Sequence, residues 1–168
     1  MKKNTDVVSA ERAYWKFNGE LVNSFDAHIS KSVPLYKEGH DLICDMSDFF
    51  IKPKSLCYEI GCSTGTLTLK LATHHQNKPE AHFIGIDIEE DMIKKAEAKL
   101  AKVEGLNASF LAEDVIELDM HEADLIICYY TVQFIKTSVR QNIINSIYEK
   151  LNWGGALFLF EKVRGADA

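Results

Sequence analysis

The sequence lacks several features that would by themselves define a class of protein. Its 168 residues contain no run that approaches the roughly eighteen apolar residues of a membrane span, and its first residues are polar. Basic residues are in the minority, with 19 Lys and Arg against 25 Asp and Glu, which disfavours direct tight binding of RNA or DNA. These absences predict a soluble, cytoplasmic protein with neither a membrane nor a nucleic acid as its partner.

Cysteine and histidine occur without the spacing of a metal site. None of the four cysteines forms a CxxC pair, and three of them lie in or beside predicted buried strands, so we interpret them as reduced structural residues. His74 and His75 are adjacent, and this spacing does not place two imidazoles on one helical face with a third ligand nearby. No metal is therefore expected.

The size and hydropathy of the chain fit one compact α/β domain. At 168 residues and 46% hydrophobic content, it can bury most of the surface that its unfolded form exposes. From Tyr58 onward, β-branched or aromatic runs alternate with helical stretches, which is typical of βαβ units and a parallel sheet. We expect strands near residues 56–61, 82–87, 108–112, 124–130 and 156–162.

Two helices between these strands carry clear signals. Apolar residues recur at helical spacing over residues 89–103, and Gly105 is in the favoured place to end that helix. A second helix is indicated by Ser138 with Gln141 three residues on, which is a capping-box pattern. The glycine-containing turn at residues 152–155 is expected to close it.

The segment before the first predicted strand has a different character. Residues 7–51 are predicted to be helical with breaks at Gly19, Pro34 and Gly39. We therefore assign residues 1–55 to an N-terminal helical lid or flank of the sheet.

A glycine-containing loop joins the first predicted strand to a helix. The segment reads Glu59-Ile60-Gly61-Cys62-Ser63-Thr64-Gly65. Its glycines allow the backbone to approach a ligand closely, and the N–H groups at the start of the helix can point at that ligand. Such a turn is also common as a plain tight connection. The glycine spacing differs from GxGxxG, which disfavours a nicotinamide dehydrogenase.

Acidic residues follow the next two predicted strands at the same edge of the sheet. Asp87 ends the second strand, where it can accept hydrogen bonds from both ribose hydroxyls of an adenosine, or can instead cap the helix that follows. Asp114 lies just past the third strand, where it is either an acceptor for the adenine amino group or a solvated loop residue.

Two tyrosines end the fourth predicted strand, where a substrate would meet a cofactor. The faces of Tyr129 and Tyr130 can attract a cationic ligand, although aromatic residues at strand ends commonly serve packing. No nucleophile and base stand out by their spacing. The catalytic residues therefore stay unknown, with these two tyrosines as candidates.

Five segments in succession resemble the motifs of class I S-adenosyl-L-methionine-dependent methyltransferases. They are EIGCSTG (59–65), GIDIEEDMI (85–93), AEDV (112–115), ADLIICYYTVQF (123–134) and YEKLNWGGALFLFEK (148–162). The resemblance implies a Rossmann-like fold for residues 56–168 and a transferase that uses S-adenosyl-L-methionine, S-adenosyl-L-homocysteine or carboxy-S-adenosyl-L-methionine. Methyl transfer from a sulfonium needs proximity, alignment and desolvation more than a nucleophile and base.

Shorter segments resemble the carboxy-S-adenosyl-L-methionine synthase family, which makes its product from prephenate for the modification of wobble uridine in tRNA. They are WKFN (15–18), SVPLY (32–36), TVQF (131–134) and NWGGAL (152–157). The resemblance implies cofactor contacts from several matching positions, to which we add Glu59 and Gly65. The candidate contacts are Tyr36, Glu59, Gly61, Cys62, Ser63, Gly65, Asp87, Ile88, Asp114, Val115 and Tyr129.

The chain departs from this family in two ways. The family has an asparagine at the position of Tyr129, so one polar contact is lost or replaced. Its members also continue into a helical segment and a terminal antiparallel hairpin, a part that carries the arginine for the transferred carboxylate. We therefore expect the fifth strand to be an exposed edge and the chain to form a homo-oligomer, with a dimer implied by the family. A methyltransferase for an unrelated small molecule and a binding module without turnover remain alternatives.

Overall fold

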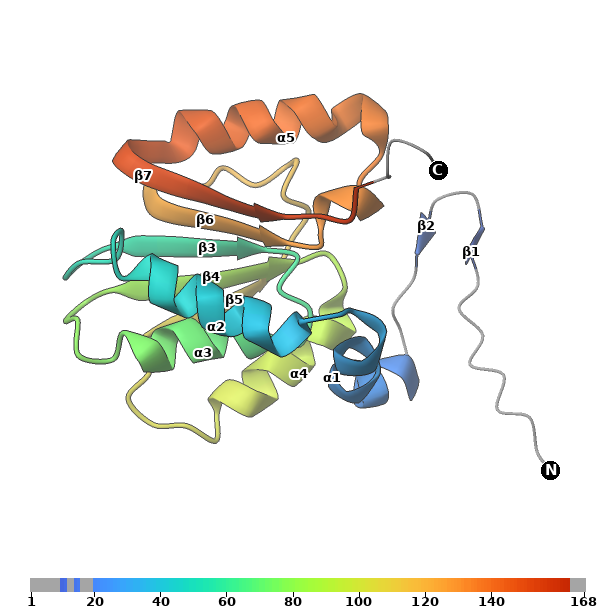
Figure 1. Cartoon of the computed structure of the whole chain (residues 1–168), viewed down its shortest axis with the longest axis horizontal. Helices are drawn as coiled ribbons and strands as arrows, with labels where there is room; N and C mark the ends of the chain where they lie inside the picture. The colour runs from blue at the N-terminus through green and yellow to red at the C-terminus, as the bar shows by residue number, and fades with distance from the viewer. Residues whose placement is uncertain (1–9, 12–13, 16–19, 164–168) are drawn as a thin grey trace.

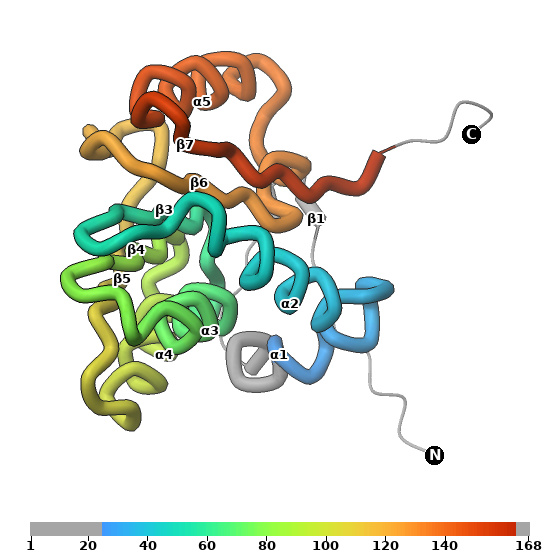
Figure 2. The backbone as a smooth tube through the Cα atoms, turned by 60° about the vertical axis from the view of Figure 1, so that its left-hand side comes forward, coloured from blue at the N-terminus to red at the C-terminus, as the bar shows by residue number. Residues whose placement is uncertain are grey.

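The computed structural model describes residues 10–11, 14–15 and 20–163, with side chains from Phe25 onward. Its centre is a five-stranded sheet with helices on both faces (Figure 1 and Figure 2). The strands lie in the order β5-β4-β3-β6-β7, and all neighbouring pairs are parallel. The strands are β3 (Leu56–Ile60), β4 (His82–Asp87), β5 (Ala108–Ala112), β6 (Ala123–Tyr129) and β7 (Leu151–Phe160). The predicted α/β fold with a five-stranded, mostly parallel sheet is confirmed.

Burial on both faces explains why the central strands form. In β6 the four residues 125–128 are completely buried, as expected for a parallel strand that helices cover from both sides. Alternate residues of β3 point to opposite faces: Cys57 joins one core cluster, whereas Tyr58 and Ile60 join the other. Each strand therefore contributes to two separate cores.

Helices form the outer layers of the molecule. The face that carries Cys57 is covered by α2 and α3, with α4 beside them, whereas α5 covers the opposite face (Figure 1). α1 packs at the side of α2 and α4. The helices are α1 (Glu20–Ser32), α2 (Tyr36–Ser47), α3 (Thr66–His74), α4 (Glu90–Leu100) and α5 (Thr137–Lys150). None of the helices in the described part of the chain is long and apolar enough to span a membrane.

A glycine in β4 sets how closely the glycine-containing loop packs on the sheet. A Cβ atom on Gly85 would lie 2.7 Å from the ring of Phe110 and 2.8 Å from Sγ of Cys62. Both distances are shorter than real Cβ contacts. The absence of a side chain at Gly85 therefore lets β5 and the loop after β3 meet over β4.

Gly39 does not break a helix, contrary to the prediction. It lies inside α2, where a Cβ atom would collide with the hydroxyl of Tyr129, so the glycine serves close packing against β6. Pro34 does separate α1 from α2. Gly19 lies outside the described residues.

Three further local predictions are wrong. α5 has Lys136 as its N-cap, with no side-chain cap, so Ser138 and Gln141 lie within the helix and form no capping box. Residues 152–155 belong to β7 as a bulge, because pairing with β6 shifts between Leu151 and Ala156. Part of the N-terminal segment pairs as two short antiparallel strands, β1 (Ala10–Glu11) and β2 (Tyr14–Trp15), since aromatic residues favour strands.

Candidate functional site

The carboxyl ends of the parallel strands define the candidate site. From β3 the sheet grows through β4 and β5 on one side and through β6 and β7 on the other, so β3 and β6 flank the point where the strand order reverses (Figure 1). Ligands of open α/β sheets bind in the crevice outside the carboxyl ends at such a point. The predicted site residues of the loops after β3, β4, β5 and β6 all meet at this edge.

The glycine-containing loop is fixed to β4 through its own N–H groups. The amides of Gly61 and Cys62 donate to the carbonyl oxygen of Ile86 at 2.8 and 2.9 Å, and the amide of Ser63 donates to Asp87 at 2.8 Å. Gly61, Ser63 and Gly65 have positive φ angles of 76°, 52° and 70°. These three amides hold the loop in place, so they are not the N–H groups that would face a ligand.

Asp87 joins the loop to the start of the next helix. Its Oδ2 accepts the hydrogen bond from the Ser63 amide at 2.8 Å, and its Oδ1 accepts one from the Glu89 amide at 3.0 Å. Each carboxylate oxygen offers about two acceptor positions, so both oxygens can also accept from ribose hydroxyls. Burial raises the pKa of Asp87 and outweighs these backbone hydrogen bonds, which lower it. Asp87 therefore orders the turn before α4 without capping the helix itself, and it leaves room for a ligand.

The residues after Asp87 and β5 form the neighbouring rim. Ile88 is 65% exposed next to Asp87, so it offers an apolar surface at this rim. Asp114 is half-buried and its Oδ1 accepts from the Ile116 amide at 2.9 Å, so it orders its own loop, with Val115 half-buried beside it. The Glu113 amide donates to the carbonyl oxygen of Asp87 at 3.1 Å, which ties this loop to β4.

Glu59 gives the site a buried acid. It is only 5% exposed, and a carboxylate oxygen accepts a hydrogen bond from the Thr68 hydroxyl. Burial, with the charge of Asp87 as a smaller cause, raises the pKa of Glu59 to about 8, although the hydrogen bonds from Thr68 lower it. Burial likewise raises the pKa of Tyr36, with the charges of Glu59 and Asp26 as additional causes. The site is therefore short of positive charge.

The two candidate tyrosines differ in their surroundings. Tyr129 is 8% exposed, its hydroxyl donates to the carbonyl oxygen of Tyr36 at 2.9 Å, and its ring lies 4.9 Å from that of His40. These contacts favour packing between α2 and β6. Tyr130 is half-buried and has a φ of 58°, a conformation that non-glycine residues rarely adopt and that clusters at functional sites.

Sequence reasoning missed a cluster around Asp26 of α1. The carboxylate accepts from the hydroxyls of Thr64 at 2.5 Å and Thr66 at 3.2 Å, and from Lys99 at 2.8 Å. Burial raises the pKa of Asp26, but the hydrogen bonds from Lys99 and Thr64 lower it by more. No local pattern connects α1 with α3 and α4. The cluster attaches α1 to the first turn of α3.

Glu161, just past β7, was also missed. Its carboxylate accepts from the amides of Val132 at 2.6 Å and Gln133 at 3.1 Å, and so holds the short 3₁₀ helix η1 (Val132–Phe134) against the end of the sheet. An acid after a strand has many possible roles. Only the folded chain brings it to the loop that follows Tyr130.

An open groove lies beside the site, between α1, α2 and α3. Its lining includes Asp26, Tyr36 and His40, but neither Asp87 nor the glycine-containing loop. The acceptors for a nucleoside lie at the sheet edge and not in the groove. Only Tyr36 is common to the groove and the predicted contacts.

The parallel sheet, the loop after β3 and the acid at the end of β4 define a Rossmann-like cofactor-binding domain. Residues 58–155 match a family described as "Methyltransferase domain", and the chain belongs to this family. The predicted superfamily and transferase class are thereby confirmed.

Curated relatives agree with this membership, and solved structures share the fold. A carboxy-S-adenosyl-L-methionine synthase from Trichodesmium erythraeum is 36% identical over 149 residues, which cover 88% of this chain and 58% of the relative. A putative S-adenosyl-L-methionine-dependent methyltransferase from Methanococcus maripaludis has a TM-score of 0.65 at 22% identity, covering 89% of this chain and 66% of that one. Magnesium protoporphyrin IX methyltransferase from Synechocystis, solved with bound S-adenosylmethionine, has a TM-score of 0.60 at 21% identity, covering 84% and 64%.

Replacing Glu59 with glutamine should change how stability depends on pH. The pKa of Glu59 is about 8 in the folded chain against an ordinary 4.5. Its contribution to folding stability is therefore complete below about pH 4.5 and is lost as the pH rises to about 8. The loss is at most about 1.4 kcal/mol per pH unit. Glu59→Gln should lack it in denaturant titrations between about pH 5 and about pH 8. Parallel pH dependences of Glu59→Gln and the exposed control Glu97→Gln would contradict the assignment.

Proposed function

We propose that the chain binds S-adenosyl-L-methionine at the carboxyl edge of its sheet and acts as a transferase of the carboxy-S-adenosyl-L-methionine synthase type. The observation that carries the proposal is the Asp87 carboxylate, which closes β4 beside the loop and has acceptor positions left for two ribose hydroxyls. The match to the curated relative, at 36% identity, covers 88% of this chain, and this chain covers 58% of the relative.

The charges around the site fit this cofactor. S-adenosyl-L-methionine carries a sulfonium and an ammonium, and Glu59, Asp87 and Asp26 are acids whose charges act on the site. A cation beside Glu59 would favour its ionised form. Ile88 offers an exposed apolar surface for the adenine ring, and Asp114 an acceptor for its amino group. The cofactor contacts expected from the sequence are retained as part of this proposal.

In this mechanism the residues of the chain bind the cofactor and orient it toward the substrate. When bound, S-adenosyl-L-methionine would supply a methyl carbon activated by its sulfonium; in a synthase of this type that carbon receives the carboxyl group of prephenate and is not itself transferred. Asp87 fixes the ribose, Glu59 and Tyr36 hold the methionyl end, and Tyr130 faces the substrate. These contacts supply alignment and exclusion of water, which are the main demands of such a transfer.

We assign residues 1–55 to a lid on the cofactor-binding domain formed by residues 56–168. The contacts that support this assignment link α1 to Thr64 through Asp26, and α2 to β6 through the hydrogen bond from Tyr129 to Tyr36. Both contacts lie next to the loop after β3. In this proposal the two helices adjoin the loop that carries one side of the cofactor site.

Asp87→Asn should weaken binding of S-adenosyl-L-methionine by at least about tenfold, because charge-assisted hydrogen bonds are typically worth roughly 1.5–3 kcal/mol. The measurement is calorimetric titration of the native chain and of the variant with S-adenosyl-L-methionine. Asp91→Asn is the matched control, since Asp91 lies in the first turn of α4 with its carboxylate paired to Lys94. An unchanged affinity in a folded Asp87→Asn protein would leave Asp87 only its role in ordering the turn before α4. Stabilisation by NAD in place of S-adenosyl-L-methionine would contradict the cofactor itself.

Incubation with S-adenosyl-L-methionine and prephenate should yield carboxy-S-adenosyl-L-methionine, because the resemblance to the synthase family implies this reaction. Mass spectrometry of the nucleoside products measures the outcome, with the Asp87→Asn variant as the control that binds weakly. Cofactor binding without this product would instead support one of two alternatives: a methyltransferase for another small molecule, or a binding module without turnover. A positive result would place the chain in tRNA modification without requiring it to bind tRNA.

The sheet edge supports the further proposal that the chain forms a homo-oligomer, with a dimer as the expected form. Among the described strands, β7 pairs only with β6, so its outer edge has backbone groups available to another chain. The cytoplasmic location expected from the sequence remains a prediction. Phe158 is buried, so substitutions that test the edge are better made at Leu159, which is 47% exposed.

Sedimentation of the native chain should detect an oligomer whose share rises with concentration. Leu159→Lys should shift it toward the monomer, because a charge on an edge strand opposes pairing between sheets. Ile116→Lys is a matched control, since Ile116 is also 47% exposed but lies outside β7. A native chain that stays monomeric at the highest concentration would refute the proposal.

A further inference from the structure

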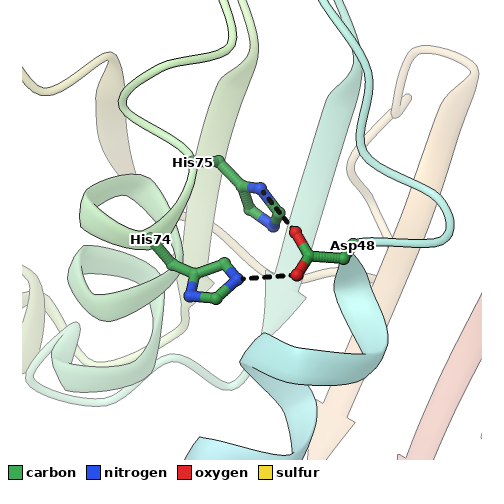
Figure 3. A group of neighbouring side chains, drawn as sticks. All are labelled: Asp48, His74 and His75. Carbon is green, nitrogen blue, oxygen red and sulfur yellow. Dashed lines mark ion pairs between the residues drawn. The ribbon is translucent and has the colours of Figure 1, made fainter.

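The carboxyl-terminal ends of α2 and α3 bring a carboxylate and two imidazoles together (Figure 3). Asp48 directly follows α2, His74 is the last residue of α3, and His75 follows it. Nε2 of His74 lies 3.3 Å from Oδ2 of Asp48, and Nδ1 of His75 lies 3.7 Å from Oδ1. Because the helices run antiparallel to the strands, this cluster lies at the end of the sheet opposite to Asp87.

The hydrogen bonds of Ser47 determine which nitrogen of His75 carries the proton. The Ser47 hydroxyl donates to the carbonyl oxygen of Cys44 at 2.6 Å, so it has no second proton to offer to Nε2 of His75, which lies 2.6 Å away. We therefore assign Nε2 as the donor to Ser47, because this tautomer makes both short contacts of the hydroxyl into hydrogen bonds. The other nitrogen, Nδ1, is left with a lone pair directed at Asp48.

This lone pair is in an unusual position. The His75 side chain is fully buried, and its Nδ1 has no hydrogen-bond partner among the described residues. Buried polar atoms without a partner are rare in folded proteins and call for an explanation. A nitrogen lone pair that faces a carboxylate can bind a cation that lies between the two groups.

The distances fit a tetrahedral metal ion. Zinc binds imidazole nitrogen and carboxylate oxygen at about 2.0–2.2 Å, which separates its ligand atoms by about 3.4 Å. The separations of 3.3 and 3.7 Å, each to a different oxygen of Asp48, lie close to this value. One ligand atom from each of the three residues lies within 4.8 Å of the others, so small movements of the side chains would bring all three to one ion. We propose that Asp48, His74 and His75 bind Zn²⁺, with water completing the coordination. Ser47 then orients His75 from behind, as outer hydrogen bonds do at zinc sites.

The proposal replaces the expectation of no metal. In the sequence, two adjacent histidines do not have the spacing of a metal site. The third ligand comes from the end of another helix, so only the folded chain brings the three residues together. Lys78 is the competing cation: its Nζ lies 3.4 Å from Oδ1 of Asp48 and donates to the carbonyl oxygen of Ile51 at 2.7 Å. If Lys78 alone satisfied Asp48, the cluster would be an ion-pair network without a metal. The two possibilities predict different zinc affinities.

Zinc binding by the full chain, freed of any affinity tag, is measured by competition with a chromophoric chelator. We expect one ion per chain, and at least about tenfold weaker binding in Asp48→Asn and in His74→Ala, because each removes one ligand. Asp45→Asn and His28→Ala are matched controls, since both residues are exposed and lie outside the cluster. Lys78→Gln should bind zinc at least as tightly as the native chain, because it removes the competing charge.

Several results would overturn the proposal. Absence of zinc binding to the native chain is one, and native affinity in Asp48→Asn or His74→Ala is another, because the ion would then bind elsewhere. Circular dichroism checks that the variants are folded, and His74→Gln replaces His74→Ala if the latter is not. Cobalt supplies an independent measurement: its visible absorption in the native chain should report nitrogen and oxygen ligands and should decrease in Asp48→Asn. An unchanged cobalt spectrum in Asp48→Asn would also contradict the assignment.

Discussion

The attachment of the loop after β3 to the end of β4 is the interaction on which the rest of the site depends. One carbonyl oxygen, that of Ile86, accepts from Gly61 and Cys62, and one carboxylate, that of Asp87, accepts from Ser63. Gly85 makes the attachment possible because a side chain there would collide with Phe110 and Cys62. The parallel pairing of β3 and β4 therefore fixes the position of the loop and places the Asp87 carboxylate beside it.

The same attachment determines the electrostatics of the site. Asp87 and Glu59 are withdrawn from water, and burial raises the pKa of both carboxyls. Asp26 differs, because Lys99 and two threonine hydroxyls compensate for its burial. A domain whose acids are partly uncompensated favours a cationic ligand, and S-adenosyl-L-methionine is such a ligand. The family membership of the chain and the charge of its site therefore agree.

The helical layer on one face of the sheet has two chemically distinct ends. Tyr36 begins α2 and the glycine-containing loop precedes α3, so the amino-terminal ends of these helices lie at the candidate cofactor site. Asp48 and the two histidines lie at their carboxyl-terminal ends (Figure 3). Because α2 and α3 pack against each other along their length, an ion that joined them at one end would also restrain the other. The two sites share a scaffold without sharing a residue.

The sequence by itself determined the strands, the loop and the acid at the end of β4, because these depend on local periodicity and on the rule that parallel strands end at one edge. Those elements were predicted within a few residues, and the family motifs lie on them. The N-cap of α5 and the bulge in β7 were not predicted, because several local patterns compete at the ends of helices and strands. Only the tertiary structure decided that Tyr129 bonds to Tyr36, that Asp26 reaches Thr64, and that Asp48 faces His75. Each of these contacts joins residues that are far apart in the sequence, so a local sequence pattern cannot predict it.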